Sequence, residues 1–109
     1  MAELLGTFEQ SVLLSIFGLG AEAYGRAILS RVQETLGREV AAGAVYATLE
    51  RLEARKLISS RLEAGTPVRG GRARRYYTLQ AEGQRALGDT RRALTAMWSN
   101  VDLPAQEGR

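Results

Sequence analysis

Apolar residues recur at intervals of three or four positions in the first half of the chain, which is the spacing of one face of an α-helix. The first such segment follows a capping-box pair, Thr7 and Gln10, and stops near Gly18 and Gly20. Its apolar stripe comprises Phe8, Val12, Ile16 and Leu19. A second stripe, which ends at the typical post-helix residue Gly37, comprises Tyr24, Ile28, Val32 and Leu36. The pattern therefore predicts two amphipathic helices in succession.

A third helix and two strand-like segments come next. The helix is predicted over about 42–55, and its buried face comprises Val45, Leu49 and Leu52. Residues 57–62 and 74–79 have the composition of strands, and the glycine-containing segment 63–73 between them is predicted to be a long loop. Three helices followed by a two-stranded hairpin are typical of a winged helix. This is a helix-turn-helix variant whose third helix enters the major groove of DNA.

The second strand is expected to divide its side chains between two environments. Successive side chains of a strand point to opposite faces. Tyr77 and Leu79 are expected to face the core, so Tyr76 and Arg74 are expected to face outward or toward a ligand.

One long helix is predicted over 81–101, where apolar and small residues alternate at spacings of four and three, as in a heptad seam. The seam comprises Gly83, Leu87, Thr90, Leu94, Met97 and Val101. A helix of this length cannot bury all its apolar side chains against one small domain, so we expect it to pair with a second copy. The predicted organisation is a winged-helix domain over 1–80, a dimerisation helix over 81–101 and a disordered tail over 102–109. The fold class is mainly α with a small β-hairpin.

The composition excludes several kinds of chemistry. The 109 residues include no cysteine and no histidine, which rules out disulfides and thiolate-bound metals and removes the commonest general base. No apolar run reaches the length of a membrane span, and the N-terminus lacks a signal pattern. We expect a soluble cytoplasmic protein that is not an enzyme and needs no cofactor or metal.

The run 69–77 holds four arginines, two glycines and no acid, in a chain of net charge +3. Such a run has two interpretations: a solvated turn, or a flexible basic tip that contacts a polyanion in a groove. Its position after three helices and a strand favours the tip of a wing that contacts nucleic acid.

Several segments resemble the PadR family of bacterial transcriptional regulators. They are Thr7-Phe8-Glu9-Gln10-Ser11-Val12-Leu13-Leu14, Ala23-Tyr24-Gly25, Gly43-Ala44-Val45-Tyr46-Ala47-Thr48-Leu49-Glu50-Arg51-Leu52-Glu53, Arg75-Tyr76-Tyr77-Thr78-Leu79, and Gly83. The resemblance covers about residues 5–100. It departs from the family pattern at Lys56, where a glycine is usual, and at Gln80-Ala81, where Thr-Pro is frequent.

The resemblance implies a homodimeric winged-helix protein that binds double-stranded DNA, usually as a repressor, and dimerises through its C-terminal helix. A two-fold dimer would present its recognition helices to a pseudo-palindromic operator. The short C-terminal part is similar to the compact branch of the family, which lacks a larger separate effector domain.

The expected DNA contacts come from the start of the second helix, the third helix and the wing. They are Tyr24, Gly25, Arg26, Ala42, Gly43, Tyr46, Ala47, Thr48, Arg51, Arg69, Arg72 and Arg74. Small residues at the start of the third helix allow close approach to a phosphate, and Ala47 and the Thr48 methyl suit a thymine methyl. Tyr46 either donates to a phosphate or caps the core, and Tyr24 either faces the DNA backbone or is a core aromatic.

The expected dimer interface comprises Leu87, Thr90, Leu94, Met97, Trp98 and Val101. Trp98 is either a simple interface anchor or, with Met97, part of a pocket between subunits for a flat apolar effector. The competing function is a protein-interaction module that dimerises without specific DNA binding. The intact wing arginines favour the DNA-binding interpretation.

Overall fold

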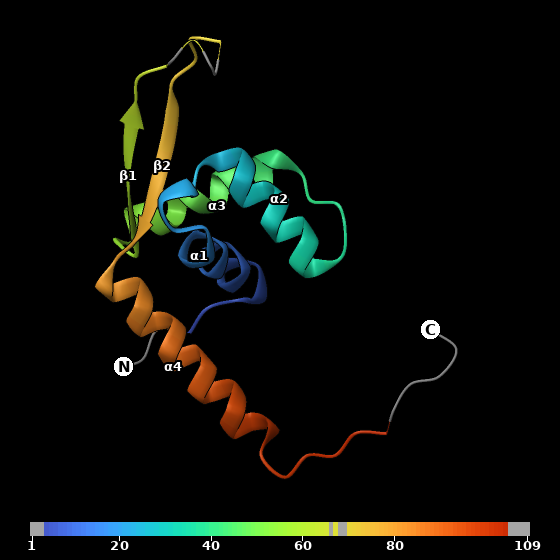
Figure 1. The fold of residues 1–109 in the computed structure, drawn as a ribbon. Helices are drawn as coiled ribbons and strands as arrows, with labels where there is room; N and C mark the ends of the chain where they lie inside the picture. Colours follow the sequence, from blue (N-terminus) through green and yellow to red (C-terminus); the bar gives the residue numbers. More distant parts are fainter. Residues whose placement is uncertain (1–3, 66, 68–69, 105–109) are drawn as a thin grey trace.

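Four α-helices and one antiparallel hairpin succeed one another in a computed structural model that describes residues 4–65, 67 and 70–104 (Figure 1). The elements are α1 (Thr7–Leu19), the 3-10 turn η1 (Gly20–Glu22), α2 (Gly25–Leu36), α3 (Ala42–Ala54), β1 (Ile58–Glu63), β2 (Arg74–Leu79) and α4 (Ala81–Trp98). We call the hairpin and its connecting residues 64–73 the wing. The predicted order of elements and the winged-helix fold class are confirmed. None of the helices in the described ranges has the length and hydropathy of a membrane span.

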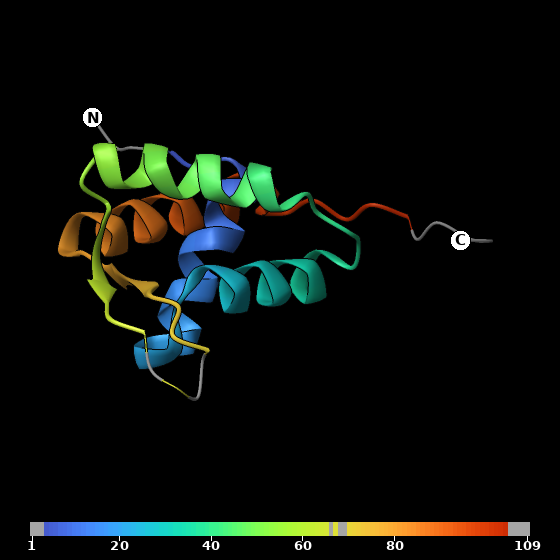
Figure 2. The ribbon, with the colours of Figure 1, turned by 90° about the horizontal axis from the view of Figure 1, so that it is seen from above.

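The core surrounds α1, which contacts α2, α3, β2 and α4 (Figures 1 and 2). The predicted apolar faces are confirmed where they meet it. The fully buried side chains of the three helices include Val12, Ile16, Ile28, Val32, Val45, Leu49 and Leu52. Gly37 adopts a left-handed conformation (φ 68°) and ends α2, as its position after the apolar stripe predicts.

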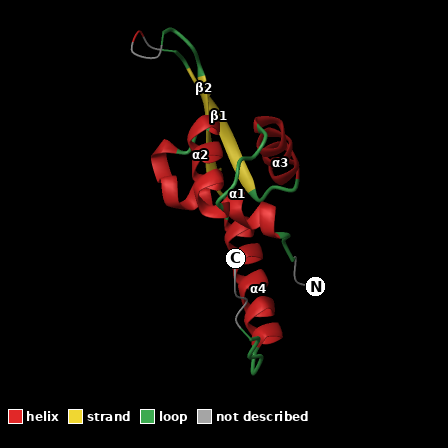
Figure 3. Ribbon diagram, turned by 90° about the vertical axis from the view of Figure 1, so that its right-hand side faces the viewer, coloured by secondary structure: helices red, strands yellow, loops and turns green. Residues whose placement is uncertain are grey.

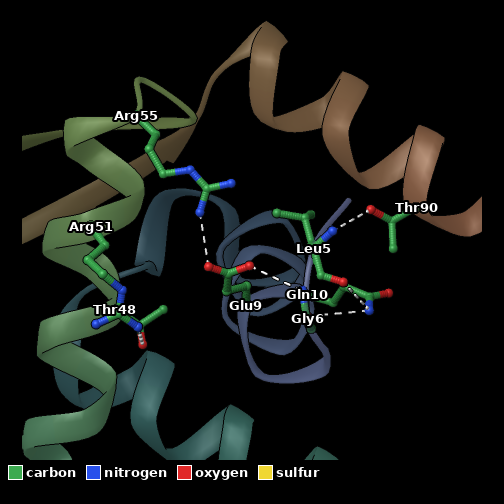
Figure 4. A network of polar contacts seen from close by, with 8 residues as sticks. All are labelled: Leu5, Gly6, Glu9, Gln10, Thr48, Arg51, Arg55 and Thr90. Carbon is green, nitrogen blue, oxygen red and sulfur yellow. Dashed lines mark hydrogen bonds and ion pairs between the residues drawn. The ribbon is translucent and has the colours of Figure 1, made fainter. Parts of the chain in front are cut away.

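The start of α1 differs from the predicted Thr7–Gln10 capping box. The cap residue is Gly6, and the Glu9 carboxylate accepts a hydrogen bond from the Gly6 N–H at 3.1 Å (Figure 4). The helix already begins at Thr7, so the acid three positions after the true cap is Glu9. The second oxygen of Glu9 binds Arg55 at 3.0 Å and ties the start of α1 to the end of α3.

Lys56 follows α3 in a left-handed conformation, with φ at 65°. Its N–H donates to the Glu53 carbonyl at 2.9 Å, and the Leu57 N–H donates to the Leu52 carbonyl at 3.0 Å. These two bonds close the C-terminus of α3 as a glycine-type cap does. The family preference for glycine at this position therefore has a local reason, and Lys56 carries strain that glycine would not.

Replacing Lys56 with glycine is expected to raise the free energy of unfolding by about 1 kcal/mol, because relief of the left-handed strain exceeds the added entropy of the unfolded chain. Urea denaturation at fixed protein concentration measures the change. Lys56→Ala is the matched control, since it removes the same side chain but keeps the Cβ and its strain. An equal gain in both variants would contradict the backbone explanation.

The hairpin pairs Ile58 with Leu79 at one end and Glu63 with Arg74 at the other. The predicted bounds of the second strand are confirmed, whereas the first begins one residue later than expected. The prediction that Tyr76 faces outward is wrong, because its side chain is only 9% exposed. The segment before α2 crosses β2 there: Tyr24 forms a bridge with Tyr76, and the Tyr77 N–H donates to the Ala23 carbonyl at 2.8 Å.

The two halves of α4 have different surroundings. In the first half Gly83, Ala86 and Thr90 are buried, and Leu87 packs partly against the core. Beyond this point α4 leaves the body of the protein, and its free end lies at the opposite extreme from the wing (Figures 1 and 3). The helix ends at Trp98 rather than at 101. Residues 102–104 have no regular structure, and the rest of the expected tail, 105–109, lies outside the described residues.

Thr90 is not part of an exposed dimer seam. It is 3% exposed, and its hydroxyl accepts a hydrogen bond from the Leu5 N–H at 3.0 Å (Figure 4). Its expected place in the dimer interface is wrong, because the segment before α1 covers this turn of α4. The exposed apolar residues beyond it include Leu94 (37%), Met97 (65%), Trp98 (56%) and Val101 (47%).

Candidate nucleic-acid interface

Residues from the start of α2, from α3 and from the base of the wing line one concave surface. The resulting cavity, which we call the wing pocket, has a volume of about 300 Å³. It is lined by Tyr24, Gly25, Arg26, Tyr46, Arg72, Ala73, Arg74, Arg75 and Tyr77. Four of these residues are arginines and none is acidic. Segments that are far apart in the sequence therefore form one strongly positive site.

The pocket wall depends on a close approach between α2 and α3. A Cβ on Gly25 would lie 2.6 Å from the Tyr46 hydroxyl oxygen, so a larger residue at this position would displace the Tyr46 ring. Gly25 is buried beneath this ring, and its expected contact with DNA stays a prediction. Tyr46 itself stays 43% exposed. It packs on Gly25 and lines the pocket, so both roles that the sequence left open for it are compatible with its position.

A ladder of side chains, with two tyrosines between two arginines, fixes the wing base against the start of α2. The Arg74 guanidinium lies 3.9 Å from the Tyr24 ring centroid, and the Tyr24 and Tyr76 rings meet edge to face at 5.7 Å. Arg61 covers the Tyr76 ring at 5.0 Å. A hydrogen bond with Tyr76 raises the pKa of Arg74, against an opposing effect of desolvation. These cation–π contacts hold Arg74 at the pocket rim.

Sequence reasoning did not identify Arg61 as part of the site. The register of the hairpin could have indicated its position, because Arg61 pairs directly with Tyr76 across the two strands. Tyr24 is half-buried in the same ladder. Its two expected roles, core aromatic and surface contact, are both compatible with this position.

The remaining arginines of the pocket differ in how they are held. Arg75 donates to the Ser60 hydroxyl at 3.1 Å, and that hydroxyl donates to the Glu53 carboxylate at 2.8 Å. Arg26 and Arg72 have neither a hydrogen bond nor an ion pair within the described ranges. Their guanidinium groups are therefore available to an anion. Arg69, another expected contact, lies outside the described residues.

Tyr77 forms the floor of the pocket and is 9% exposed. Burial raises the pKa of its hydroxyl, and the neighbouring Arg75 partly opposes the shift. The hydroxyl is therefore neutral at physiological pH, so it adds a hydrogen-bonding group without adding negative charge to the site.

The outward face of α3 contains the small residues that the sequence analysis placed there. The exposed residues of α3 include Ala42, Gly43, Tyr46, Ala47 and Glu50. No side chain caps the start of the helix at Ala41, so no described side chain competes with an anion there.

Thr48 does not belong to this face, because it is 1% exposed and packs in the core. Its expected contact with a thymine methyl is wrong. The sequence spacing indicates this burial, because Thr48 lies three residues after Val45 and four before Leu52, and both of these residues are buried. Its hydroxyl instead accepts a hydrogen bond from Arg51 at 3.0 Å, which holds this exposed side chain on α3 (Figure 4).

Comparison with known proteins agrees with this architecture. The sequence profile of the transcriptional regulator PadR-like family matches residues 13–89. A PadR-like transcription factor from Bacteroides fragilis has 27% identity and a TM-score of 0.72, with 88% of this chain and 87% of that chain covered. A PadR family regulator from Eggerthella lenta has 28% identity and a TM-score of 0.64, over 83% and 76% of the two chains. One from Clostridium difficile R20291 has 25% identity and a TM-score of 0.63, over 86% and 96%. No curated protein sequence matches the chain.

Proposed function

Since the chain belongs to the transcriptional regulator PadR-like family, we propose that it is a homodimeric repressor that binds a pseudo-palindromic DNA operator. The observation that carries the proposal is the wing pocket, where four arginines and no acid converge beside the exposed face of α3. A winged helix places its third helix in the major groove. The start of α2 and the wing base then lie against the phosphate backbone.

The proposed contacts are of two kinds: those that bind the DNA backbone and position the protein, and those that recognise the base sequence. Arg26 and Arg72 neutralise phosphates, and Tyr24 and Tyr46 donate their hydroxyls to the backbone. Arg74 reaches the backbone from its stack on Tyr24. The remaining proposed contacts are Ala42, Gly43, Ala47 and Arg51 on α3, with Arg69 on the wing. Because α3 presents few long polar side chains, affinity comes mainly from phosphate neutralisation, and specificity from a few α3 contacts and from groove shape.

Replacing Arg72 with glutamine is expected to reduce the slope of log K against log salt concentration by about one unit, because one phosphate contact is lost. Fluorescence anisotropy of a labelled duplex over a salt series measures the slope. Arg92→Gln is the matched control: it removes the same charge from α4, where Arg92 pairs with Asp89 outside the pocket. An unchanged slope for Arg72→Gln would exclude Arg72 as a phosphate contact.

Selection from a randomised duplex pool tests the function itself. We expect the purified protein to enrich an inverted repeat whose half-sites lie about one or more helical turns apart, since a two-fold dimer presents two recognition helices. The absence of any enrichment at low salt would contradict the proposal and favour a protein-interaction module.

The second half of α4 supports the proposed dimer. Leu94, Met97 and Trp98 of α4 are exposed apolar residues, as is Val101 just after the helix, and we call these four residues the α4 seam. Such a surface is typical of an isologous interface. Part of this proposal is that Met97 and Trp98 line a pocket between subunits for a flat apolar effector that releases DNA.

Binding of such an effector is expected to quench the fluorescence of Trp98, the single tryptophan of the chain. Titration of the dimer with a broad panel of aromatic ligands measures this. Quenching that also weakens duplex binding is the expected outcome. No change across the panel would count against an effector pocket at the seam and would leave Trp98 an interface anchor.

A further inference from the structure

We propose that the wing pocket binds the phosphoryl groups of a free oligophosphate, such as the diphosphate or triphosphate of a nucleotide, and that this ligand competes with DNA. The inference rests on the proposed function only in that the pocket lies on the surface proposed to face DNA. The free anion is thereby a regulator of the same site.

The charge of the lining favours more than one phosphoryl group. The pocket is lined by four arginines and by no carboxylate. A terminal phosphoryl group carries about two negative charges at pH 7, so a single group neutralises only about half of the lining. Two linked phosphoryl groups match it. An apolar ligand would cover Arg26 and Arg72 without giving their guanidinium groups a partner, at high cost.

The concave shape favours a free anion over the backbone of a duplex. A phosphodiester is attached to sugars on both sides, so it can contact the mouth of a cavity but cannot enter it. A terminal phosphoryl group is attached on one side only. The wing pocket, at about 300 Å³, reaches the small end of the range for small-molecule sites.

The hydrogen-bond donors of the pocket include side chains that are held in place by neighbours and side chains that are free to move. Tyr24 is held between Arg74 and Tyr76, and Tyr46 is held over Gly25. These side chains lose little freedom when a ligand binds, which favours affinity. Arg26 and Arg72 are without partners among the described residues and can close on the anion from two sides. Arginine is suited to this role because its planar fork binds two phosphoryl oxygens at once.

Isothermal titration calorimetry of the DNA-free protein with sodium pyrophosphate tests the inference, in chloride buffer of constant ionic strength without divalent cations. We expect one pyrophosphate per chain. Arg26→Gln should weaken binding by about tenfold or more, because one charge-assisted contact is lost. Arg92→Gln, the control outside the pocket, should bind pyrophosphate as the parent protein does. Arg26 is exposed, and circular dichroism checks that its variant is folded.

Parallel titrations with adenosine triphosphate and adenosine distinguish the phosphoryl groups from the nucleoside. Adenosine should not bind, and both phosphorylated compounds should displace a labelled duplex at constant ionic strength. Equal binding of adenosine and adenosine triphosphate would overturn the phosphoryl assignment. Pyrophosphate binding that leaves the duplex in place would overturn the competition. If the duplex binds and pyrophosphate does not, the inference fails while the DNA-binding function stands; if neither binds, both fail.

Discussion

Replacing Gly83 with alanine is expected to lower the free energy of unfolding by about 3 kcal/mol, at the upper end of what overpacking costs. Gly83 lies in the first turn of α4, where the helix meets the start of the hairpin. A Cβ at this position would overlap the Leu57 carbonyl oxygen and lie 2.6 Å from Leu79 Cδ1. The carbonyl belongs to the backbone and cannot rotate away. The whole helix must therefore shift.

Gly88→Ala is the matched control in the same helix. A Cβ there meets only Arg92 Nη1, at 3.6 Å, which is an ordinary contact. Alanine in a helix interior is more favourable than glycine by about 0.5–1 kcal/mol, so this variant should be more stable than the parent protein. Urea denaturation of both variants at one protein concentration measures the difference. Equal behaviour of the two variants would show that α4 does not pack on Leu57 as described.

Replacing Met97 and Trp98 together with glutamate is expected to weaken the dimer by at least about a hundredfold, which corresponds to about 3 kcal/mol. The two side chains are 65% and 56% exposed in the single chain, so the charges cost little in the monomer. In a paired seam, they would face each other in an apolar interface. Sedimentation over a dilution series measures the dissociation constant. Duplexes with one half-site should retain their affinity, whereas inverted repeats should lose their advantage.

Glutamates at Ala96 and Ser99 provide the control for this pair. Both positions are exposed; Ala96 lies on the opposite side of α4 from Leu94 and Trp98, and Ser99 directly follows the helix. The control adds the same charge to the same two turns and should leave the dimer intact. If the Met97–Trp98 variant stays dimeric at nanomolar concentration, the α4 seam is not the interface.

The sequence predicted best what depends on short-range periodicity. The buried faces of α1, α2 and α3 follow from apolar spacing, and the bounds of β2 follow from a tyrosine-rich run beside glycines. These patterns reflect the neighbours that each residue has within its own element. Gly37 was predictable for the same reason, because a left-handed residue after an apolar stripe is a local requirement.

The sequence predicted least what depends on contacts between distant segments. Tyr76 is covered by the segment before α2, and Thr90 by the segment before α1. No periodicity within β2 or α4 encodes these encounters. Arg61 joins the candidate site only because the hairpin register places it opposite Tyr76. The burial of Gly25 beneath Tyr46 is likewise set by the contact between α2 and α3, which no local spacing encodes.

The hydrogen bond between Leu5 and Thr90 joins residues 85 positions apart in the sequence. During synthesis, the segment before α1 cannot form this bond until the 85 residues that lead to Thr90 have been made. Contacts of such long range slow folding, because the intervening loop must close before they form. The nascent chain consequently acquires its last core contacts and its α4 seam at almost the same moment, which shortens the time during which an incompletely folded chain could associate with another copy.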